Sequence, residues 1–448
     1  MPSKITLTIT QGKLSRQQYV FESRSTCIVG RNDDCNLQIA DKVDMTISRY
    51  HCLLDINPPD IRVRDLGSLN GTFVNGKNIG QRQKQQLAKE AIKLNFPEYN
   101  LQDGDEIKLG DILFKIGVQV EEQLNKIPDL PVQEENAKIK FLTITKKLLN
   151  LAQDGNVSLQ SISGYNLIKS LGKGDFGEVF LAKHIQTKRS IAIKIMLPAV
   201  ATQKQGIEMF LRETENIKIL QHPHIVQLLD YGFVENTFFF TMEYFSGGNV
   251  WDLMQRSGWR LPIDIAVDVT LQVLDGLIYA HEVEISNIKS VNGIITKGKG
   301  LVHQDLKPNN IFISKINDKL VIKIGDYGLS KAFDLAGLSG QTLTGTKMMG
   351  TPAFMPRQQV LNFKDELPEI DVWATAACLY NMLTGYFPRD FTGDPWLSVL
   401  QNNPVPILQR HHGIPQKLAK VIDLALQEKP QIYFQTAAEF KQALLDCM

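Results

Sequence analysis

A carboxylate, a lysine and a carboxamide stand in close succession within the stretch Leu301–Asn310. Asp305 comes first, Lys307 follows two residues later, and Asn310 follows five residues after Asp305. Asp305 can accept the proton of an attacking hydroxyl, Lys307 can neutralise a phosphoryl group in transfer, and Asn310 can offer an oxygen to Mg²⁺. The order and spacing therefore suit the transfer of a phosphoryl group to an alcohol.

A second carboxylate, Asp326, follows the apolar run Val321–Ile324 and precedes Tyr327 and Gly328. At the end of a predicted strand, Asp326 is placed to be a stronger Mg²⁺ ligand than Asn310. Either fragment alone would be weak evidence, because Asp, Asn, Pro and Gly are common turn residues. Together they resemble the catalytic loop and the metal-binding Asp-Phe-Gly motif of the protein kinases, with Tyr327 in the Phe position. The resemblance implies a bilobal α+β fold that uses ATP.

Two predicted strands upstream carry further chemistry. The G-x-G-x-x-G turn in Leu171–Val179 is followed by strand residues, which favours a β-hairpin lid over ATP phosphates rather than a dinucleotide-binding fold. In the strand Ile191–Ile195, the period of two places Ala192 and Lys194 on the face opposite to the isoleucines. A lysine on an inner face is costly unless it is paired, so Lys194 requires anionic partners.

The resemblance assigns the remaining nucleotide contacts. It pairs Glu213, in a predicted amphipathic helix, with Lys194, and it makes Met242 the gatekeeper before an adenine-binding hinge. We interpret Glu208 and Glu215, the alternative partners of Lys194, as solvated. The predicted ATP-binding residues are Leu171, Gly172, Lys173, Gly174, Asp175, Phe176, Gly177, Val179, Ala192, Lys194, Met242, Glu243 and Phe245. The predicted catalytic residues are Lys194, Glu213, Asp305 and Lys307, and the predicted metal ligands are Asn310 and Asp326.

The sequence departs from the kinase pattern at three positions. Gln304 stands where many kinases carry an arginine that pairs with a phosphorylated activation loop, which puts phosphate-gated ordering in doubt. Pro356-Arg357 replaces the expected Ala-Pro-Glu motif, and Tyr433 replaces the arginine that normally pairs with its glutamate. Both halves of that salt bridge are therefore absent, and we hypothesise that Arg357 stacks on Tyr433.

Other features of this region leave room for interpretation. Residues 282–300 form a longer connection than the family normally has, which favours a surface hairpin over a substrate or partner contact. Asp371 is expected to hold the catalytic loop, and Thr351 to shape the substrate pocket. Lys307, with Gly350–Pro352, is typical of serine/threonine kinases. Candidate autophosphorylation sites are Ser339, Thr342, Thr344 and Thr346.

The N-terminal segment has an all-β pattern. Apolar and polar residues alternate from Ile5 to Thr10 and again in Cys52–Ile56 and Ile61–Val63. Turn clusters such as Asn75-Gly76 separate these runs. Short strands with regular turns predict a β-sandwich.

Polar residues on the predicted loops of this sandwich form an anion-binding set: Arg31, Ser48, Arg49, His51, Asn70 and Asn75. Guanidinium and hydroxyl groups bind phosphate oxygens, although an exposed arginine alone is usually only solvated. Their order closely resembles the forkhead-associated (FHA) domain, which recognises phosphothreonine in peptides. By that resemblance Arg31, Ser48 and Arg49 face the phosphate, Asn70 contacts the peptide backbone, and His51 and Asn75 brace the loops.

Composition limits the remaining classes. The 448 residues carry a net charge of +1, which gives no reason to expect nucleic acid as a partner. No stretch approaches the roughly 18–20 apolar residues of a membrane span, and the amino terminus lacks a signal-peptide pattern. The five cysteines include no C-x-x-C pair and predict reduced thiols in a cytoplasmic protein.

We therefore expect a multidomain chain. Residues 1–120 form an FHA-like all-β sandwich, residues 121–163 form a linker with a short helix, and residues 164–448 form the kinase. Its N-lobe spans about 164–245 and its C-lobe about 246–448. The expected function is ATP-dependent phosphorylation of Ser or Thr in protein substrates, with Mg²⁺ or alternatively Mn²⁺, and binding of phosphothreonine in partners or in the kinase itself.

A reading from a different class stays open. The chain would then be a pseudokinase scaffold that acts through phosphopeptide binding, as Gln304 and residues 350–357 suggest. The intact Lys194, Asp305 and Asp326 argue against it.

Overall fold

A computed structural model describes residues 4–22, 25–40, 43–86, 96–119, 144–150, 162–174, 177–196, 214–234, 237–289, 295–317, 319–327, 351–361, 367–391 and 394–448. Contacts divide the chain into two compact units. The first comprises Met1–Leu124, Thr351–Gln435 and Asp446–Met448, and the second comprises Asn125–Gly350 and Thr436–Leu445. Among the described residues, no helix is both long and apolar enough to span a membrane.

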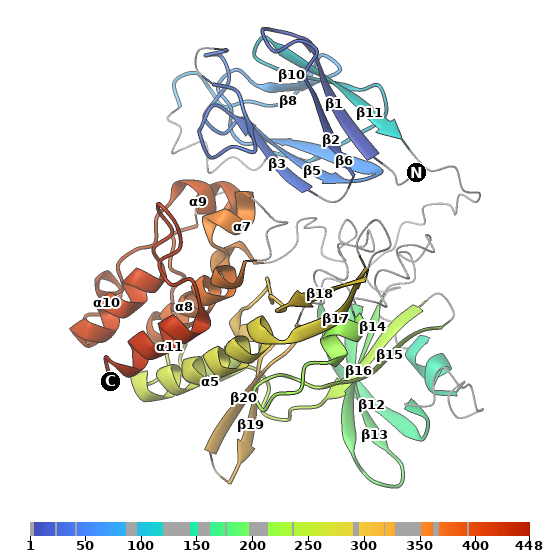
Figure 1. Cartoon of the computed structure of the whole chain (residues 1–448), viewed down its shortest axis with the longest axis vertical. Helices are drawn as coiled ribbons and strands as arrows, with labels where there is room; N and C mark the ends of the chain where they lie inside the picture. Colours follow the sequence, from blue (N-terminus) through green and yellow to red (C-terminus); the bar gives the residue numbers. More distant parts are fainter. Residues whose placement is uncertain are drawn as a thin grey trace. The chain divides into compact units, whose positions relative to one another are not determined.

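The N-terminal part of the first unit is a two-layered β-sandwich (Figure 1). One sheet has the order β2 (Gln18–Phe21), β1 (Lys4–Gln11), β11 (Ile112–Gln119), β10 (Glu106–Leu109), β7 (Thr72–Val74) and β8 (Lys77–Gly80). The other has the order β4 (Leu37–Gln38), β3 (Ser25–Gly30), β5 (Cys52–Asn57), β6 (Asp60–Asp65) and β9 (Tyr99–Leu101). The predicted sandwich is thus confirmed.

The sandwich core follows from the period-two pattern of its strands. Ile5, Leu7 and Ile9 of β1 are fully buried, whereas the threonines between them are only partly buried. Cys27 and Leu54 are cross-strand partners in the other sheet and join the same core. Inward-facing residues of both sheets therefore fill one layer between them.

The second unit begins with a five-stranded antiparallel sheet. Its order is β12 (Tyr165–Gly174), β13 (Gly177–His184), β14 (Ser190–Met196), β16 (Thr237–Glu243) and β15 (Leu228–Val234). Ile191, Ile193 and Ile195 pack on one face, and Ala192 packs on the other. The alternation predicted for this strand is therefore confirmed.

The short helix predicted in the linker is present at residues 144–150. Leu148 and Leu149 are buried against the same face of the sheet as Phe180 and Ile193. The sequence left open which domain the helix would join, and the structure places it on this sheet. The domain boundaries at residues 120 and 164 stay predictions; β11 ends at Gln119 and β12 begins at Tyr165.

Helices follow the sheet in the second unit. α4 (Val250–Arg256) starts with a capping box, in which Asn249 and Asp252 bond each other's backbone amides. α5 (Ile263–Glu282) packs against β20 (Lys319–Ile324) and against α11 (Ala437–Leu445) (Figure 1). The hairpin β17 (Glu284–Lys289) and β18 (Ile295–Lys299) occupies the long connection, as the sequence favoured. The catalytic stretch follows it, with η3 (Pro308–Asn310) and the hairpin β19 (Ile311–Ile316) and β20 (Lys319–Ile324).

The first unit also contains the described helices between residues 351 and 435. These are η4 (Pro352–Phe354), α7 (Arg357–Leu361), α8 (Pro368–Thr384), α9 (Pro395–Gln401), η5 (Ile407–Gln409) and α10 (Gln416–Ala425). Every residue of α8 from Ile370 to Thr384 is buried, so α8 is the central helix of this group.

Candidate functional site

The catalytic stretch brings its three polar side chains together. Lys307 Nζ lies 2.8 Å from Asp305 Oδ2. Asn310 Nδ2 donates to the carbonyl of Asp305 at 2.8 Å and to its Oδ2 at 3.3 Å. These contacts fix the Asp305 carboxylate between an ammonium group and an amide, and Asn310 is the last residue of η3.

A buried histidine ties this stretch to the second carboxylate. His303 Nδ1 accepts from the amide of Asp305 at 3.2 Å, so its Nε2–H donates to the carbonyl of Gly325 at 2.9 Å. The amide of Gly325 donates to the carbonyl of Asn310 at 2.7 Å. The sequence alone predicted no role for His303, although its place two residues before Asp305 is the signal that could identify it.

Asp326 faces the lysine of the nucleotide-binding sheet. Its Oδ1 lies 3.0 Å from Lys194 Nζ. Lys194 is buried, with 7% of its surface exposed. Burial alone would raise the pKa of Asp326, but the charge and hydrogen bond of Lys194, helped by His303 and Lys307, lower it. Asp326 is therefore an anion suited to a divalent cation. Its φ of 54° is left-handed, which marks a strained position.

Four of the predicted nucleotide-binding residues, Val179, Ala192, Lys194 and Met242, share one face of the sheet. Val179 is the cross-strand partner of Lys194, and Ala192 that of Met242. Only glycine fits at position 177, because an added Cβ would lie 2.0 Å from the carbonyl oxygen of Ile195. Of the other predicted ATP-binding residues, Leu171, Gly172 and Lys173 are exposed on β12, and Gly174 ends that strand. Asp175, Phe176 and Glu213 lie outside the described residues, as do the candidate autophosphorylation sites.

The predicted hinge is tied to β20 by contacts that the sequence did not indicate. Glu243 Oε2 pairs with Lys323 Nζ at 2.6 Å. The same ammonium lies 5.7 Å from the ring centroid of Phe245, which stacks on Phe312 at 6.1 Å. Lys323 and Phe312 thus position the hinge residues predicted to bond adenine. Glu215 is exposed and accepts a hydrogen bond from Tyr231, in agreement with its interpretation as solvated.

The donor set fits Mg²⁺. Asp326 and Asn310 can each offer a side-chain oxygen, and Mg²⁺ is commonly held by one or two such groups together with substrate phosphates and water. Within the described part of the chain, no cluster of three or more His, Cys, Asp or Glu residues forms a separate metal site. A site completed by ATP phosphates is consistent with both observations.

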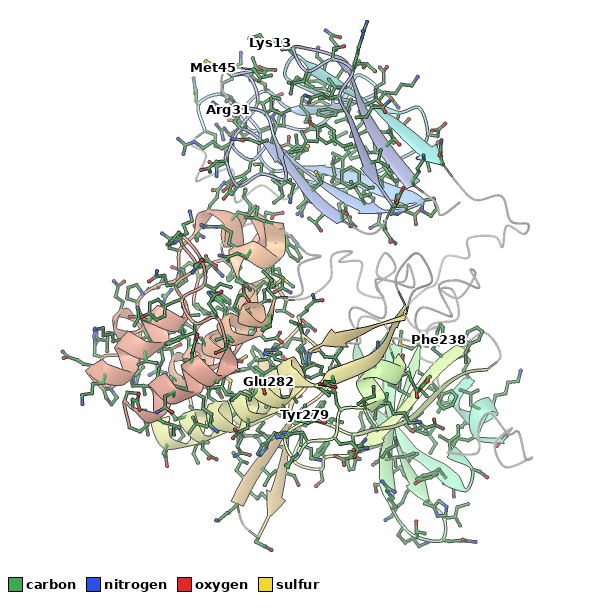
Figure 2. The ribbon with its side chains drawn as sticks, in the orientation of Figure 1. Lys13, Arg31, Met45, Phe238, Tyr279 and Glu282 are labelled. Carbon is green, nitrogen blue, oxygen red and sulfur yellow. The ribbon has the colours of Figure 1, made fainter. Side chains whose placement is uncertain are left out.

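The anion-binding residues of the sandwich converge on its loops. The backbone amide of Arg31 donates to the carbonyl of Ser48 at 3.0 Å, and Arg31 Nε donates to the carbonyl of Ile47. Arg31 lies on a loop beside the strands (Figure 2). Ser48 Oγ accepts from the amide of Leu69 at 2.9 Å. Arg49 is exposed, and Asn70 Nδ2 donates to the carbonyl of Thr46 at 2.6 Å.

His51 and Asp65 brace these loops from inside. His51 is fully buried, accepts from the amide of Ser48 at its Nδ1, and bonds the carbonyl of Gly71 through Nε2 at 3.0 Å. Asp65 accepts from the amide and hydroxyl of Ser68 and from the hydroxyl of Thr72. The expected bracing role of His51 agrees with these contacts, whereas Asp65 was not assigned a role.

We predict that acidification loosens these loops through His51. Burial lowers the pKa of His51 below 6.5, although Asp65, the Gly71 carbonyl and Asp44 oppose this effect. Below pH 6.5 the unfolded state binds the proton more readily than the folded state, so stability present above 6.5 is lost as the pH falls. The expected slope is at most about 1.4 kcal/mol per pH unit.

Hydrogen exchange of the β5 amides between pH 7 and 5, corrected for intrinsic rates, measures this effect. His51→Asn, whose amide can accept from Ser48, should have a flatter profile. Equal profiles for both proteins would contradict the prediction.

A family model of the protein kinase domain matches residues 165–403, which is more than half of the chain. The chain belongs to the protein kinase family. A second model, that of the FHA domain, matches residues 27–110. This kinase therefore carries an FHA domain in its N-terminal sandwich, and both predicted resemblances are confirmed.

Bacterial serine/threonine-protein kinases are among its relatives. The kinase is 30% identical over 289 residues to PknB of Mycobacterium leprae, and the match covers 63% of this chain and 42% of the relative. It is 26% identical over 279 residues to a probable serine/threonine-protein kinase, CPE1738, of Clostridium perfringens, with 61% and 37% covered. The match thus spans less than half the length of these curated relatives.

One solved structure extends over both domains. The crystal structure of Rad53 1-466 in complex with AMP-PNP is 21% identical to this kinase and covers 98% of this chain and 99% of its own, with a TM-score of 0.47. This TM-score is too low to support an inference about the kinase.

The family's salt bridge, whose two positions here hold Arg357 and Tyr433, is replaced by an ion pair between two other residues. Arg389 Nη2 pairs with Glu428 Oε1 at 2.5 Å, with side chains 0% and 3% exposed. Arg389 also donates to the carbonyl of Met355 at 2.9 Å and lies over the ring of Trp373. Glu428 in turn accepts from the amide of Arg357 at 2.8 Å. The pair thus anchors both sides of the segment Met355–Arg357.

The stacking hypothesis for Arg357 gains no support. Arg357 is 4% exposed and Tyr433 is 49% exposed, and the ring partner of Tyr433 is Phe434. Arg357 Nε and Nη1 are buried without a hydrogen-bond partner among the described residues. The expectation failed because the compensating charges sit at positions outside the family motif.

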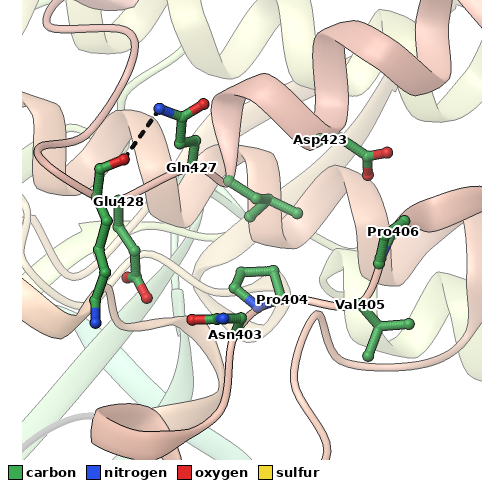
Figure 3. Close-up of a pocket in the computed structure, with 9 residues that line it drawn as sticks. Asn403, Pro404, Val405, Pro406, Asp423, Gln427 and Glu428 are labelled. Carbon is green, nitrogen blue, oxygen red and sulfur yellow. Dashed lines mark hydrogen bonds between the residues drawn. The ribbon is translucent and has the colours of Figure 1, made fainter.

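A pocket in the C-terminal helices borders this pair. It is lined by Asn403–Pro406 and by residues of 423–429 that include Glu428 (Figure 3). Burial raises the pKa of Asp423 in this pocket, which accepts from the amide of Ile407 at 2.9 Å. No predicted site residue lines this pocket.

Asp371 is fully buried at the start of α8, and its expected support of the catalytic loop stays a prediction.

Proposed function

We propose that this chain is an ATP-dependent serine/threonine protein kinase. The observation that carries the proposal is the linked arrangement of Lys307–Asp305 and Lys194–Asp326 through the His303 and Asn310 hydrogen bonds. Each acidic group has a cation at 3.0 Å or less, and the backbone bonds fix the spacing of the two carboxylates. Serine or threonine as acceptor is supported by Lys307 and by the names of the relatives.

Each residue has a separate role in the phosphoryl transfer. Asp305 accepts the proton of the acceptor hydroxyl, and Lys307 stabilises the negative charge on the moving phosphoryl group. Lys194 exchanges Asp326 for the α- and β-phosphates of ATP, while Glu213 orients Lys194. Mg²⁺, held by Asp326 and Asn310, would neutralise the phosphate oxygens.

Peptides with a single acceptor test the acceptor class. The kinase should phosphorylate serine or threonine peptides with Mg-ATP and leave the matched tyrosine peptide unmodified. Transfer to the tyrosine peptide alone would refute serine or threonine as the acceptor.

A cytoplasmic location is part of the proposal, supported by five free cysteines. Burial raises the pKa values of the Cys27 and Cys35 thiols to about 12.

The FHA domain, in the same proposal, binds phosphothreonine in partners or in the kinase itself. Arg31, Ser48 and Arg49 meet on adjacent loops, where two guanidinium groups and a hydroxyl can bind one phosphate. The Ser48 loop is braced by His51, which reduces the entropy lost on binding. The sequence of the peptide and the choice between cis and trans binding stay open.

Arg31→Ala is predicted to weaken phosphothreonine binding at least tenfold, since it removes a charge-assisted contact worth about 1.5–3 kcal/mol. Calorimetric titration of the full chain with a phosphothreonine peptide measures the affinity. Arg16→Ala, an arginine on a turn of the same sandwich, is the matched control. Equal affinity for the unphosphorylated peptide would refute this role.

A further inference from the structure

The outer side of one FHA sheet is buried, although the outer face of a sandwich sheet is normally solvated. The strand register places Ile28, Leu53 and Arg64 in one row across β3, β5 and β6. Asp55 and Arg62 form the next pair on the same face. Ile28 and Leu53 are 0% and 1% exposed, and the three charged residues are at most 8% exposed.

The core between the two sheets does not account for the burial of Ile28 and Leu53. Successive side chains of a strand point to opposite faces, and Cys27, Val29 and Leu54 point into the core. Ile28 and Leu53 are absent from the group of residues that forms this core. Their side chains therefore pack outside the sandwich core, on the face where Arg62 pairs with Asp55 at 3.6 Å and with Glu98 at 3.8 Å.

A buried ion pair identifies the covering segment. Arg64 Nη1 lies 2.7 Å from Asp394 Oδ2, and the two side chains are 9% and 5% exposed. Asp394 is the N-cap of α9 and also accepts from the amide of Leu397 at 2.8 Å. Arg64 Nε and Nη2 make no hydrogen bond within the described residues, so Asp394 is the partner that compensates this charge.

A second set of contacts joins the same sheet to α7. The amide of Ile28 donates to Asn36 Oδ1 at 2.8 Å, and Asn36 Nδ2 donates to the carbonyl of Leu361, the last residue of α7. α7 also packs against β3. Burial raises the pKa of the Tyr50 hydroxyl, and the nearby Arg357 guanidinium opposes this rise. These contacts lie within one compact unit, which holds the sandwich and Thr351–Gln435.

We propose that the outer face of this sheet is an interaction surface whose partner is α7 and the first turn of α9 of the same chain. The apolar row of Ile28 and Leu53 supplies the buried area, and Arg64 with Asp394 supplies charge complementarity. An intramolecular partner is favoured because the connecting chain keeps its effective concentration high.

This surface gives the FHA domain a fixed place on the helices of Thr351–Gln435, within the first unit. η4 packs against α9, and α7 packs against α9 as well. Docking on α7 and α9 therefore holds the FHA domain near η4, which directly follows Thr351, the residue expected to shape the substrate pocket. That consequence rests on the proposed kinase function, whereas the docking itself does not.

Hydrogen exchange of the full-length chain tests the docking. Arg64→Glu places two carboxylates together, and Asp394→Asn removes the charge while keeping a residue that caps helices equally well. Both variants should exchange at least tenfold faster than the wild type at β3, β5 and α7. The β1 amides should be unchanged, which separates undocking from unfolding of the sandwich.

Asp390→Asn is the matched control, since Asp390 pairs with Arg410 at an exposed site in the same segment. Unchanged exchange at β3 and α7 in both test variants would overturn the proposal. Protection that disappears on dilution of the wild type would also overturn it, because the partner would then be a second copy. Loss of kinase activity with normal exchange protection would count against the proposed function and leave the docking intact.

Discussion

Replacing Asp305 with asparagine is expected to slow phosphoryl transfer to a serine or threonine peptide by about 10²–10⁴-fold. Asparagine keeps the size of the side chain but cannot accept the proton of the acceptor hydroxyl. The variant also loses the ion pair in which Lys307 Nζ lies 2.8 Å from Asp305 Oδ2. The rate constant kcat measures this effect, and the KM for ATP should change little.

Asp268→Asn is the control for this variant. Asp268 lies on α5 and accepts a hydrogen bond from Gln272 at 2.8 Å, outside the catalytic stretch. It should retain the wild-type kcat. A kcat for Asp305→Asn within threefold of the wild type would show that Asp305 does not act as the base.

Glu428→Gln is expected to reduce the free energy of unfolding by about 3–5 kcal/mol. The change leaves the Arg389 guanidinium without a counter-charge at a site where its side chain is 0% exposed. Burial already lowers the pKa of Arg389, and Glu428 is the group that opposes this. Urea unfolding followed by tryptophan fluorescence reports on this site, because Arg389 lies 4.5 Å from the ring centroid of Trp373.

A double variant separates the ion pair from packing. Arg389→Met with Glu428→Gln removes both charges and should cost clearly less than the sum of the two single changes. Asp390→Asn, at the exposed pair with Arg410, should cost less than about 1 kcal/mol. A loss below 1 kcal/mol for Glu428→Gln would contradict the anchoring role of this pair.

Local patterns in the sequence predicted much of the fold and the grouping of the candidate catalytic residues. Period-two alternation assigned Ile193 and Lys194 to opposite faces of β14, because strand geometry alone sets that alternation. Asp305, Asn310 and Asp326 stand at fixed short spacings, so the sequence could predict their grouping. The pairing of Lys194 with Asp326 links residues 132 positions apart and was not predicted, because the family resemblance paired Lys194 with Glu213 and assigned Asp326 to the metal.

Contacts without such a local signal could not be predicted. Arg389 and Glu428 are 39 residues apart, and neither position belongs to a recognised motif. Lys323 and Glu243 are 80 residues apart and resemble ordinary surface charges in the sequence. Arg64 likewise alternates correctly as an outward-facing strand residue, and its burial depends on what packs outside the sandwich.

The intact mass of the purified chain after incubation with Mg-ATP tests the central claim most directly. The account predicts that the wild type gains phosphates of about 80 Da each. It predicts no added phosphate in Asp326→Asn or Lys194→Met. These variants lack the metal ligand and the phosphate-binding lysine, respectively. If no phosphate is added to the wild type, and neither serine nor threonine peptides are phosphorylated, the chain is a phosphopeptide-binding scaffold and the account is wrong.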